Sequence, residues 1–107
     1  MNIIFLKGRF TKEPDLLEDK EKNAYIRFDL AVNRPYSEET DFFHCIAFKK
    51  KAEAIFQYLQ KGSLVFIQGY QKTDIWEGKD GKKNYKNVVI VEKIDFLSSP
   101  SLLEKEG

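Results

Sequence analysis

Apolar and polar residues alternate most regularly over Ala24–Asn33, where one set of side chains is entirely apolar and the other is mostly polar. A period of two residues predicts a strand with one buried face. Shorter or less regular alternation predicts four further strands. These cover Ile3–Phe10, Asp41–Phe48, Ser63–Thr73 and Asn84–Val91, the last extended by Ile94–Leu97.

Helical spacing occurs once, between the third and fourth predicted strands. Ala52, Ile55, Phe56 and Leu59 lie at positions i, i+3, i+4 and i+7, which places them on one helix face. Gly62 follows and is predicted to end the helix. The remaining segments read as connections, namely a turn around Pro14 and polar stretches at 19–23, 34–40 and 74–83.

The predicted order is three strands, one helix and two strands. This is the layout of an all-β OB-fold, a five-stranded Greek-key barrel with one helix between strands 3 and 4. A barrel of another topology, or a small antiparallel sheet covered by one helix, would give a similar pattern. With 107 residues, 42% of them apolar, the chain can build one core. We expect one domain over residues 1–97 and a short flexible tail over 98–107.

Composition argues against a membrane or secreted protein. The longest apolar stretches have four residues, as in Ile3–Leu6, whereas a membrane helix needs roughly 20. Met1 leads directly into a strand-like run without the features of a signal peptide. Cys45 is the only cysteine, so an internal disulfide is excluded. These features predict a cytoplasmic protein with no membrane partner.

The formal net charge is only +1, but the basic residues are unevenly distributed. The segment Phe42–Val91 carries nine lysines against four acidic residues. Single lysines usually do no more than solvate a surface. Here aromatic residues are interleaved with them, and cations beside stacking surfaces are what unpaired nucleic acid requires.

The predicted strand Asp41–Phe48 is apolar on both faces. Phe43, Cys45 and Ala47 are the smaller set and are expected to point inward, which leaves Phe42, His44, Ile46 and Phe48 facing outward. Either a neighbouring subunit covers the two outward phenylalanines or they form a stacking platform for bases. Trp76 and Tyr36 lie in polar segments, where a core role is not expected.

Catalysis is not expected from this sequence. His44 and Cys45 are adjacent on a strand, so they point to opposite faces and cannot pair as base and nucleophile. A second histidine or cysteine that could complete a zinc site is lacking. Gly78–Lys82 does not end as a phosphate-binding loop does. We therefore expect no enzyme, no metal and no cofactor.

Four segments together resemble bacterial single-stranded DNA-binding proteins. They are NIIFLKGRFTKEPDL at residues 2–16, FDLAVNR at 28–34, DFFHCIAF at 41–48 followed by Ala52 and Glu53, and the run from Tyr58 through Lys61, Gly62 and Val65 to Gly69. The resemblance covers Asn2 to about Leu97 in order and spacing. It implies an OB-fold that assembles as a homotetramer and binds and protects single-stranded DNA in replication, recombination or repair, associated with the nucleoid.

The resemblance also implies site residues. The family's stacking aromatics fall on Tyr36, Phe42, Phe48 and Trp76. Its phosphate-contacting basic positions fall on Lys50, Lys61, Lys72 and Lys83. Arg34 matches such a position less closely. The alternation of side chains along the strand independently indicates Phe42 and Phe48, and the polar surroundings independently indicate Trp76 and Tyr36.

The chain departs from the family pattern in several places. Tyr36 and Phe42 stand at positions often held by tryptophan, which keeps a stacking ring but with less area. Gln71 stands where the family usually has an aliphatic residue, and Val88 stands where it usually has glutamate. Both differences concern the geometry of the last hairpin and the packing of subunits. The family's flexible linker and acidic tip are missing, so we expect no recruitment of repair enzymes through such a tip. An OB-fold accessory module of a primosome-type or RNA-binding kind remains the alternative. Preference for unstructured oligonucleotides over duplex would argue against it.

Overall fold

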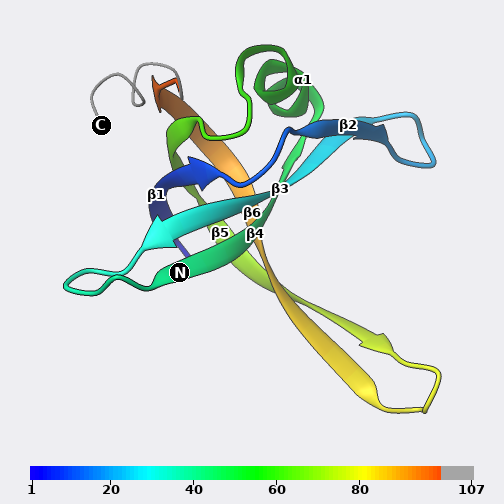
Figure 1. Ribbon diagram of the computed structural model, residues 1–107. Helices are drawn as coiled ribbons and strands as arrows, with labels where there is room; N and C mark the ends of the chain where they lie inside the picture. The colour runs from blue at the N-terminus through cyan, green and yellow to red at the C-terminus, as the bar shows by residue number, and fades with distance from the viewer. Residues whose placement is uncertain (100–107) are drawn as a thin grey trace.

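The predicted strands form a single sheet that closes on itself (Figure 1). The computed structural model describes residues 1–99. Its elements are β1 (Ile4–Phe10), β2 (Asp15–Glu18), β3 (Ala24–Asn33), β4 (Thr40–Phe48), α1 (Lys49–Tyr58), β5 (Leu64–Glu77) and β6 (Lys83–Ser98). Among residues 1–99 no helix is long and apolar enough to cross a membrane.

The strand order is that of a barrel. It runs β1-β5-β6-β4-β3, and β3 pairs back with β1 to close the ring. β4 and β6 are parallel, and the other pairs are antiparallel. This is an OB-fold, as the sequence predicts, with α1 between β4 and β5.

The predicted count of five strands was wrong, because residues 1–99 form six. The additional strand, β2, pairs with β3 at the edge of the sheet and is not part of the closed ring. It has only four residues and all of them are exposed. A strand with no buried face has no periodic pattern in the sequence, so hydrophobic periodicity could not reveal it.

The core fills the inside of the barrel. Phe10 of β1 stacks on Phe28 of β3 with ring centroids 4.4 Å apart. The other buried apolar side chains come from every ring strand and from α1; they include Leu6, Ile26, Leu30, Cys45, Ala47, Ala52, Ile55, Val65, Ile67, Val89 and Val91. Because one face of each ring strand is buried, the outer face is left available for binding.

The helix closes one end of the barrel, packing against β2, β3 and β4. Ala52 and Ile55 are buried as predicted, and Leu59 is buried just beyond the helix end. Phe56 departs from the prediction because its side chain is half exposed. Gly62 does not end the helix, which stops at Tyr58. Instead Gly62 takes a positive φ of 86° in the turn before β5, where its N–H bonds to the carbonyl of Phe10.

β5 and β6 continue beyond the barrel as a two-stranded arm (Figure 1). Half of the predicted polar connection over 74–83 is therefore strand, because pairing continues to Glu77 and Lys83 and only 78–82 form the turn. Gly69 lies at a register shift in β5, in agreement with the predicted bend. A Cβ at Gly69 would lie 1.9 Å from the carbonyl oxygen of Ile90, so only glycine permits this close approach of the two strands.

The predicted domain boundary near residue 97 lies close to the end of β6 at Ser98. Of the predicted tail over 98–107, residues 100–107 lie outside the described part of the chain.

Candidate nucleic-acid interface

The outer face of β4 carries exposed aromatic rings. Phe42 is 61% exposed and Phe48 is 43% exposed. Cys45 and Ala47 are buried, and Phe43 packs against the core. The predicted division of this strand into an inner and an outer set is therefore confirmed.

β3 contributes the neighbouring row of outward side chains. Residues directly opposite each other on antiparallel strands share a face. The outward pairs are Phe42 with Ala31, His44 with Asp29, Ile46 with Arg27 and Phe48 with Tyr25. The Arg27 guanidinium lies 5.6 Å from the centroid of the Tyr25 ring. The outer face thus combines aromatic surface with a cation and one carboxylate.

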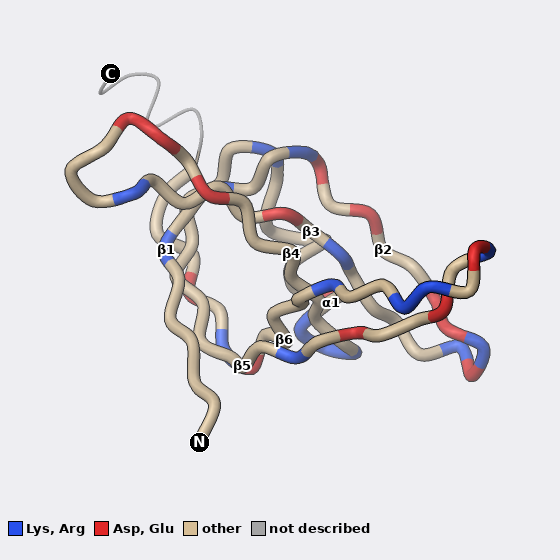
Figure 2. The backbone as a smooth tube through the Cα atoms, turned by 90° about the horizontal axis from the view of Figure 1, so that it is seen from below, with Lys and Arg blue, Asp and Glu red and all other residues tan. Residues whose placement is uncertain are grey.

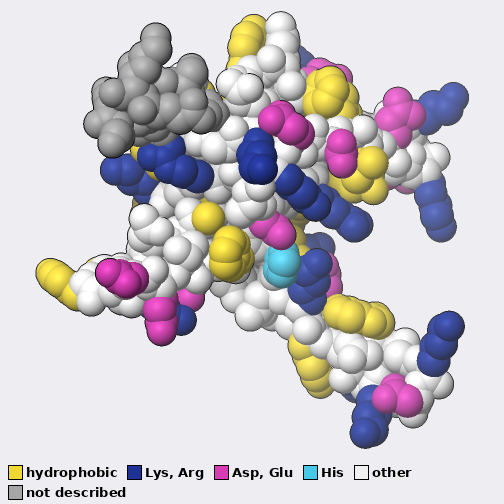
Figure 3. Space-filling model, viewed as in Figure 1, with side chains coloured by type: hydrophobic (Ala, Val, Ile, Leu, Met, Phe, Trp, Pro, Cys, Tyr) yellow, Lys and Arg dark blue, Asp and Glu magenta, His cyan; other side chains and the backbone are white. Residues whose placement is uncertain are grey.

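The arm turns one of its faces toward this row. Trp76 is 49% exposed, and alternate residues of β5 together with their partners on β6 lie on its side of the arm. Between arm and barrel runs a groove of about 520 Å³. We call it the arm groove; its lining consists of Lys12, Arg27, Phe28, Asp29, His44, Cys45, Ile46, Lys72, Asp74, Trp76, Lys86 and Val88. Figure 3 shows the hollow between the barrel and the extended arm.

A second hollow adjoins the arm groove, because His44 and Lys86 line both. Phe42 lines this second hollow together with Gln71 and Asn87. Two of the predicted site residues, Trp76 and Lys72, therefore share the arm groove, and Phe42 lines the adjoining hollow together with residues of the other face of the arm. Phe48 lies on the same outward row of β4, two positions beyond Ile46.

The arm groove has more basic than acidic side chains. Lys12, Arg27, Lys72 and Lys86 line it, against the carboxylates of Asp29 and Asp74. Lys72 lies 3.2 Å from Asp74, and His44 Nδ1 lies 2.6 Å from Asp29 Oδ1. Outside the groove, basic and acidic residues are both scattered along the described backbone, as Figure 2 shows. A phosphate entering the groove would meet an excess of cations.

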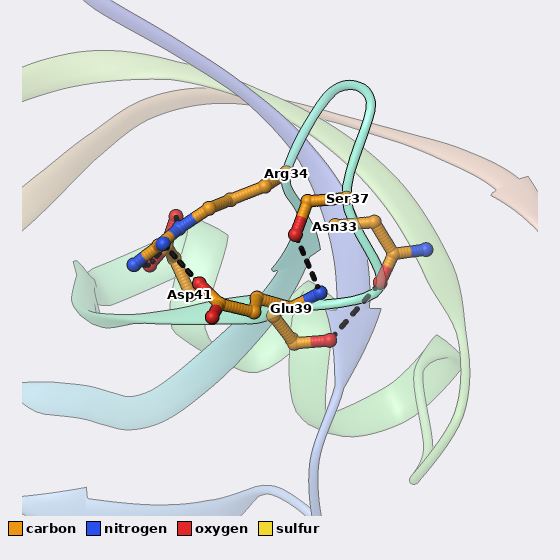
Figure 4. Close-up of polar contacts among 6 residues, drawn as sticks. Asn33, Arg34, Ser37, Glu39 and Asp41 are labelled. Atoms are coloured by element: carbon orange, nitrogen blue, oxygen red, sulfur yellow. Dashed lines mark hydrogen bonds and ion pairs between the residues drawn. The ribbon is translucent and has the colours of Figure 1, made fainter.

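Arg34 is held by carboxylates in the loop between β3 and β4 (Figure 4). Its Nε lies 3.0 Å from Asp41 Oδ2 and its second terminal nitrogen lies 2.9 Å from Asp41 Oδ1, while the first contacts Glu39. Hydrogen bonds from Arg34 lower the pKa of Asp41. The guanidinium of Arg34, which was predicted to contact phosphate, is therefore engaged in ion pairs with Asp41 and Glu39.

Tyr36 lies in the same loop and is fully exposed, with a positive φ of 60°. Arg34 fixes the base of the loop, and a hydrogen bond of 3.2 Å from Thr40 to Asn33 ties its two sides. The loop presents the tyrosine ring to solvent without a partner ring among the described residues.

The other predicted lysines lie outside the arm groove. Lys50 is in the first turn of α1 and Lys61 is in the turn after it, where its backbone N–H donates to Glu13 at 3.2 Å. Lys83 begins β6 at the far end of the arm, opposite Glu77. Lys50 and Lys61 are not brought together with Trp76, whereas Lys83 lies next to Asn84, the cross-strand partner of Trp76, on the other face of the arm.

Six polar residues of the arm groove were not predicted as site residues from the sequence: Lys12, Arg27, Asp29, His44, Asp74 and Lys86. Arg27 and Asp29 belong to the polar set of the clearest alternating strand, so their outward direction was predictable. Their proximity to Trp76 was not, because it depends on how the arm leaves the barrel. His44 had been considered only as a possible catalytic base.

Cys45 is unsuited to nucleophilic chemistry. Burial, and to a smaller extent the negative charge of Asp29, raise the pKa of its thiol to about 12. The raised pKa means that the folded chain holds this proton more tightly than the unfolded chain. The buried Cys45 thiol therefore contributes to the stability of the fold below the ordinary pKa of a thiol, and this contribution is lost as pH rises toward 12.

We expect iodoacetamide to leave Cys45 almost unmodified at pH 8 in the native protein and to modify it rapidly in denaturant, because the thiolate is the reactive form. Mass spectrometry of timed samples measures this. Equal rates in both states would show that the thiol is accessible and ionised in the folded chain.

Among residues 1–99 no group of three or more histidine, cysteine, aspartate or glutamate side chains is arranged to hold a metal ion.

The chain is similar to known proteins over most of its length. The model of the single-strand binding protein family matches residues 1–97. Single-stranded DNA-binding protein 3 of Listeria innocua is 39% identical over 104 residues, which cover 92% of this chain and 65% of that protein. The single-stranded DNA-binding protein of Bacillus cereus is 41% identical over 102 residues, which cover 91% and 60%.

The chain spans 65% and 60% of the lengths of these two relatives. The single-stranded DNA-binding protein of Clostridium perfringens is 43% identical over 101 residues, covering 92% of this chain and 67% of that protein. The family match includes all of the barrel and the arm. On this evidence the chain belongs to the single-strand binding protein family.

Proposed function

We propose that this protein binds single-stranded DNA without sequence preference and protects it, and that it catalyses no reaction. The observation that carries the proposal is the arm groove, in which an exposed tryptophan lies among four cationic side chains. Its relatives are named single-stranded DNA-binding proteins. A role in replication, recombination or repair, on DNA in the cytoplasmic nucleoid, follows from this activity.

Bases and phosphates would be held by different groups. Every base has a π-face, so stacking tolerates any sequence, whereas lysines hold the backbone. The rings proposed to stack are Tyr36, Phe42, Phe48 and Trp76. The proposed phosphate contacts are Lys50, Lys61, Lys72 and Lys83. Arg34 would contribute only after its ion pairs with Asp41 and Glu39 open.

Lysine contacts make binding dependent on salt. Each neutralised phosphate releases condensed counterions, so the logarithm of the affinity should fall with the logarithm of the salt concentration by about 0.7 per phosphate on single strands. Lys72→Ala and Lys83→Ala should each flatten this slope in titrations of a short oligo-dT. Lys20→Ala is the matched control, because Lys20 is exposed in the turn between β2 and β3. Equal affinity at low and high salt would contradict the phosphate contacts.

We also propose that the chain self-associates, as a homotetramer. The observation that supports self-association is an exposed apolar surface at β1, where Ile3 is 52% and Phe5 is 58% exposed. Phe5 stacks on Phe66 of β5 with centroids 5.9 Å apart. Exposed apolar patches of this kind commonly mark interfaces.

Light scattering at micromolar concentration should give the mass of four chains, and Phe5→Glu should lower it by placing a charge in the interface. A monomer mass for the unmodified protein would contradict the assembly and leave the DNA-binding proposal standing.

A further inference from the structure

His44 is the only histidine of the chain, and its position in the arm groove is unusual for a solvating side chain. The imidazole is half exposed and lies where the two hollows meet. Its Nδ1 is 2.6 Å from Asp29 Oδ1 across the β3–β4 pair. An ionised carboxylate only accepts hydrogen bonds, so Nδ1 carries a proton in this contact.

That contact determines what the other ring nitrogen can do. A neutral imidazole has one N–H, and here it is directed at Asp29. Nε2 then has a lone pair, which cannot donate to a phosphate oxygen. Only after a second proton is taken up can Nε2–H donate to an anion while Nδ1–H stays on Asp29.

Charged groups from several elements line the groove together with His44. They are Asp29 and Arg27 of β3, Lys72 and Asp74 of β5, Lys86 of β6, and Lys12. Of these, Asp29 contacts the imidazole directly. A phosphate in the groove adds a third negative charge beside the ring, which shifts the balance toward the protonated form.

We infer that His44 is a phosphate-binding residue of the arm groove that acts through proton uptake. In the complex the imidazolium bridges Asp29 and a DNA phosphate, and it also cancels the repulsion between that phosphate and the Asp29 carboxylate. The bond formed is a hydrogen bond from Nε2 to the phosphate oxygen, and the proton comes from the buffer. This inference rests on the proposed function, because the phosphate is that of bound single-stranded DNA.

The inference predicts a pH dependence located in one residue. Imidazoles change charge between pH 5 and 8, where phosphodiesters and ordinary carboxylates remain ionised for most of the range. Between pH 6 and pH 8 the affinity for a short oligo-dT should fall several-fold. The fall cannot exceed about tenfold per pH unit, because a single proton is involved.

The test compares the complete chain with His44→Gln and His44→Arg, using fluorescence anisotropy of labelled oligo-dT at constant ionic strength. His44→Gln should bind as weakly at pH 6 as the unmodified protein binds at pH 8. His44→Arg should bind tightly at both pH values, since its charge is permanent. Calorimetry in two buffers of different ionisation enthalpy should find more protons taken up by the unmodified protein than by His44→Gln.

Asp29→Asn provides a second test that leaves the imidazole in place. Removing the carboxylate should raise affinity at pH 8, whereas Asp95→Asn, an exposed carboxylate of β6 outside the arm groove, should not. Thermal melting checks that each variant is folded.

The outcomes separate the two proposals. Binding with the same pH dependence in the unmodified protein and in His44→Gln would overturn the role of His44 and leave DNA binding intact. Equal behaviour of His44→Gln and His44→Arg would overturn it as well. Failure of the unmodified protein to bind oligo-dT at any pH would overturn the proposed function, and this inference with it.

Discussion

Replacing Trp76 or Phe48 with alanine should weaken binding of oligo-dT about fivefold to 150-fold, because stacking contributes about 1–3 kcal/mol per base. Both rings are exposed, so their removal should leave the core intact. Trp76→Phe and Phe48→Tyr keep a π-face and should lose less. The loss in the alanine variants should persist at high salt, where lysine contacts are screened. Anisotropy of a labelled oligonucleotide measures all four variants, since Trp76 is the only tryptophan.

Phe96 is the matched control for this experiment. It is 53% exposed, lies opposite Val65 in the barrel part of β6 and lines neither hollow. Phe96→Ala should therefore bind nearly as well as the unmodified protein. Full affinity in both Trp76→Ala and Phe48→Ala, or a melting temperature that collapses in both, would refute the stacking role.

Phe10→Ala should lower the free energy of unfolding by about 3–5 kcal/mol, as truncation of a large buried aromatic does. The ring is 2% exposed and stacks on Phe28 at 4.4 Å, so truncation leaves a cavity in the centre of the barrel. The strand cannot move inward to fill it easily, because the Phe10 backbone is fixed by hydrogen bonds to Ser63 and from Gly62. Urea denaturation followed by circular dichroism gives the value.

Tyr58→Ala is the control for Phe10→Ala. The Tyr58 ring is 70% exposed at the end of α1, so its removal should cost much less stability. A loss below about 1 kcal/mol for Phe10→Ala would mean that the stacked pair is not central to the core.

The sequence pattern predicted those parts of the fold in which one strand face is buried. β3 was found to the residue because its apolar side chains recur with a period of two, and β4, which is apolar on both faces, was found to within one residue. The arm and β2 carried no such signal. Ile75 and Tyr85 are exposed on one face of the arm and Trp76 on the other, so burial does not alternate along it.

The sequence indicated individual residues of the candidate site, but it did not indicate which of them lie close together in space. Parity on one strand is enough to direct Phe42 and Phe48 outward. The placement of Trp76 in one groove with Asp29 and His44 depends instead on how the arm leaves the barrel, near the register shift at Gly69. The ion pairs of Arg34 form because the loop between β3 and β4 folds back and brings Asp41 beside Arg34. The composition of the loop does not reveal that conformation.

The central claim, binding of unpaired DNA, is tested most directly by titrating the intrinsic fluorescence of Trp76 with oligo-dT and with a duplex of matched length. The account predicts strong quenching and saturation at low concentration with oligo-dT, since a base stacks on the indole, and far weaker binding of the duplex, whose bases are already stacked. Equal or tighter binding of the duplex, or no response to oligo-dT, would contradict it.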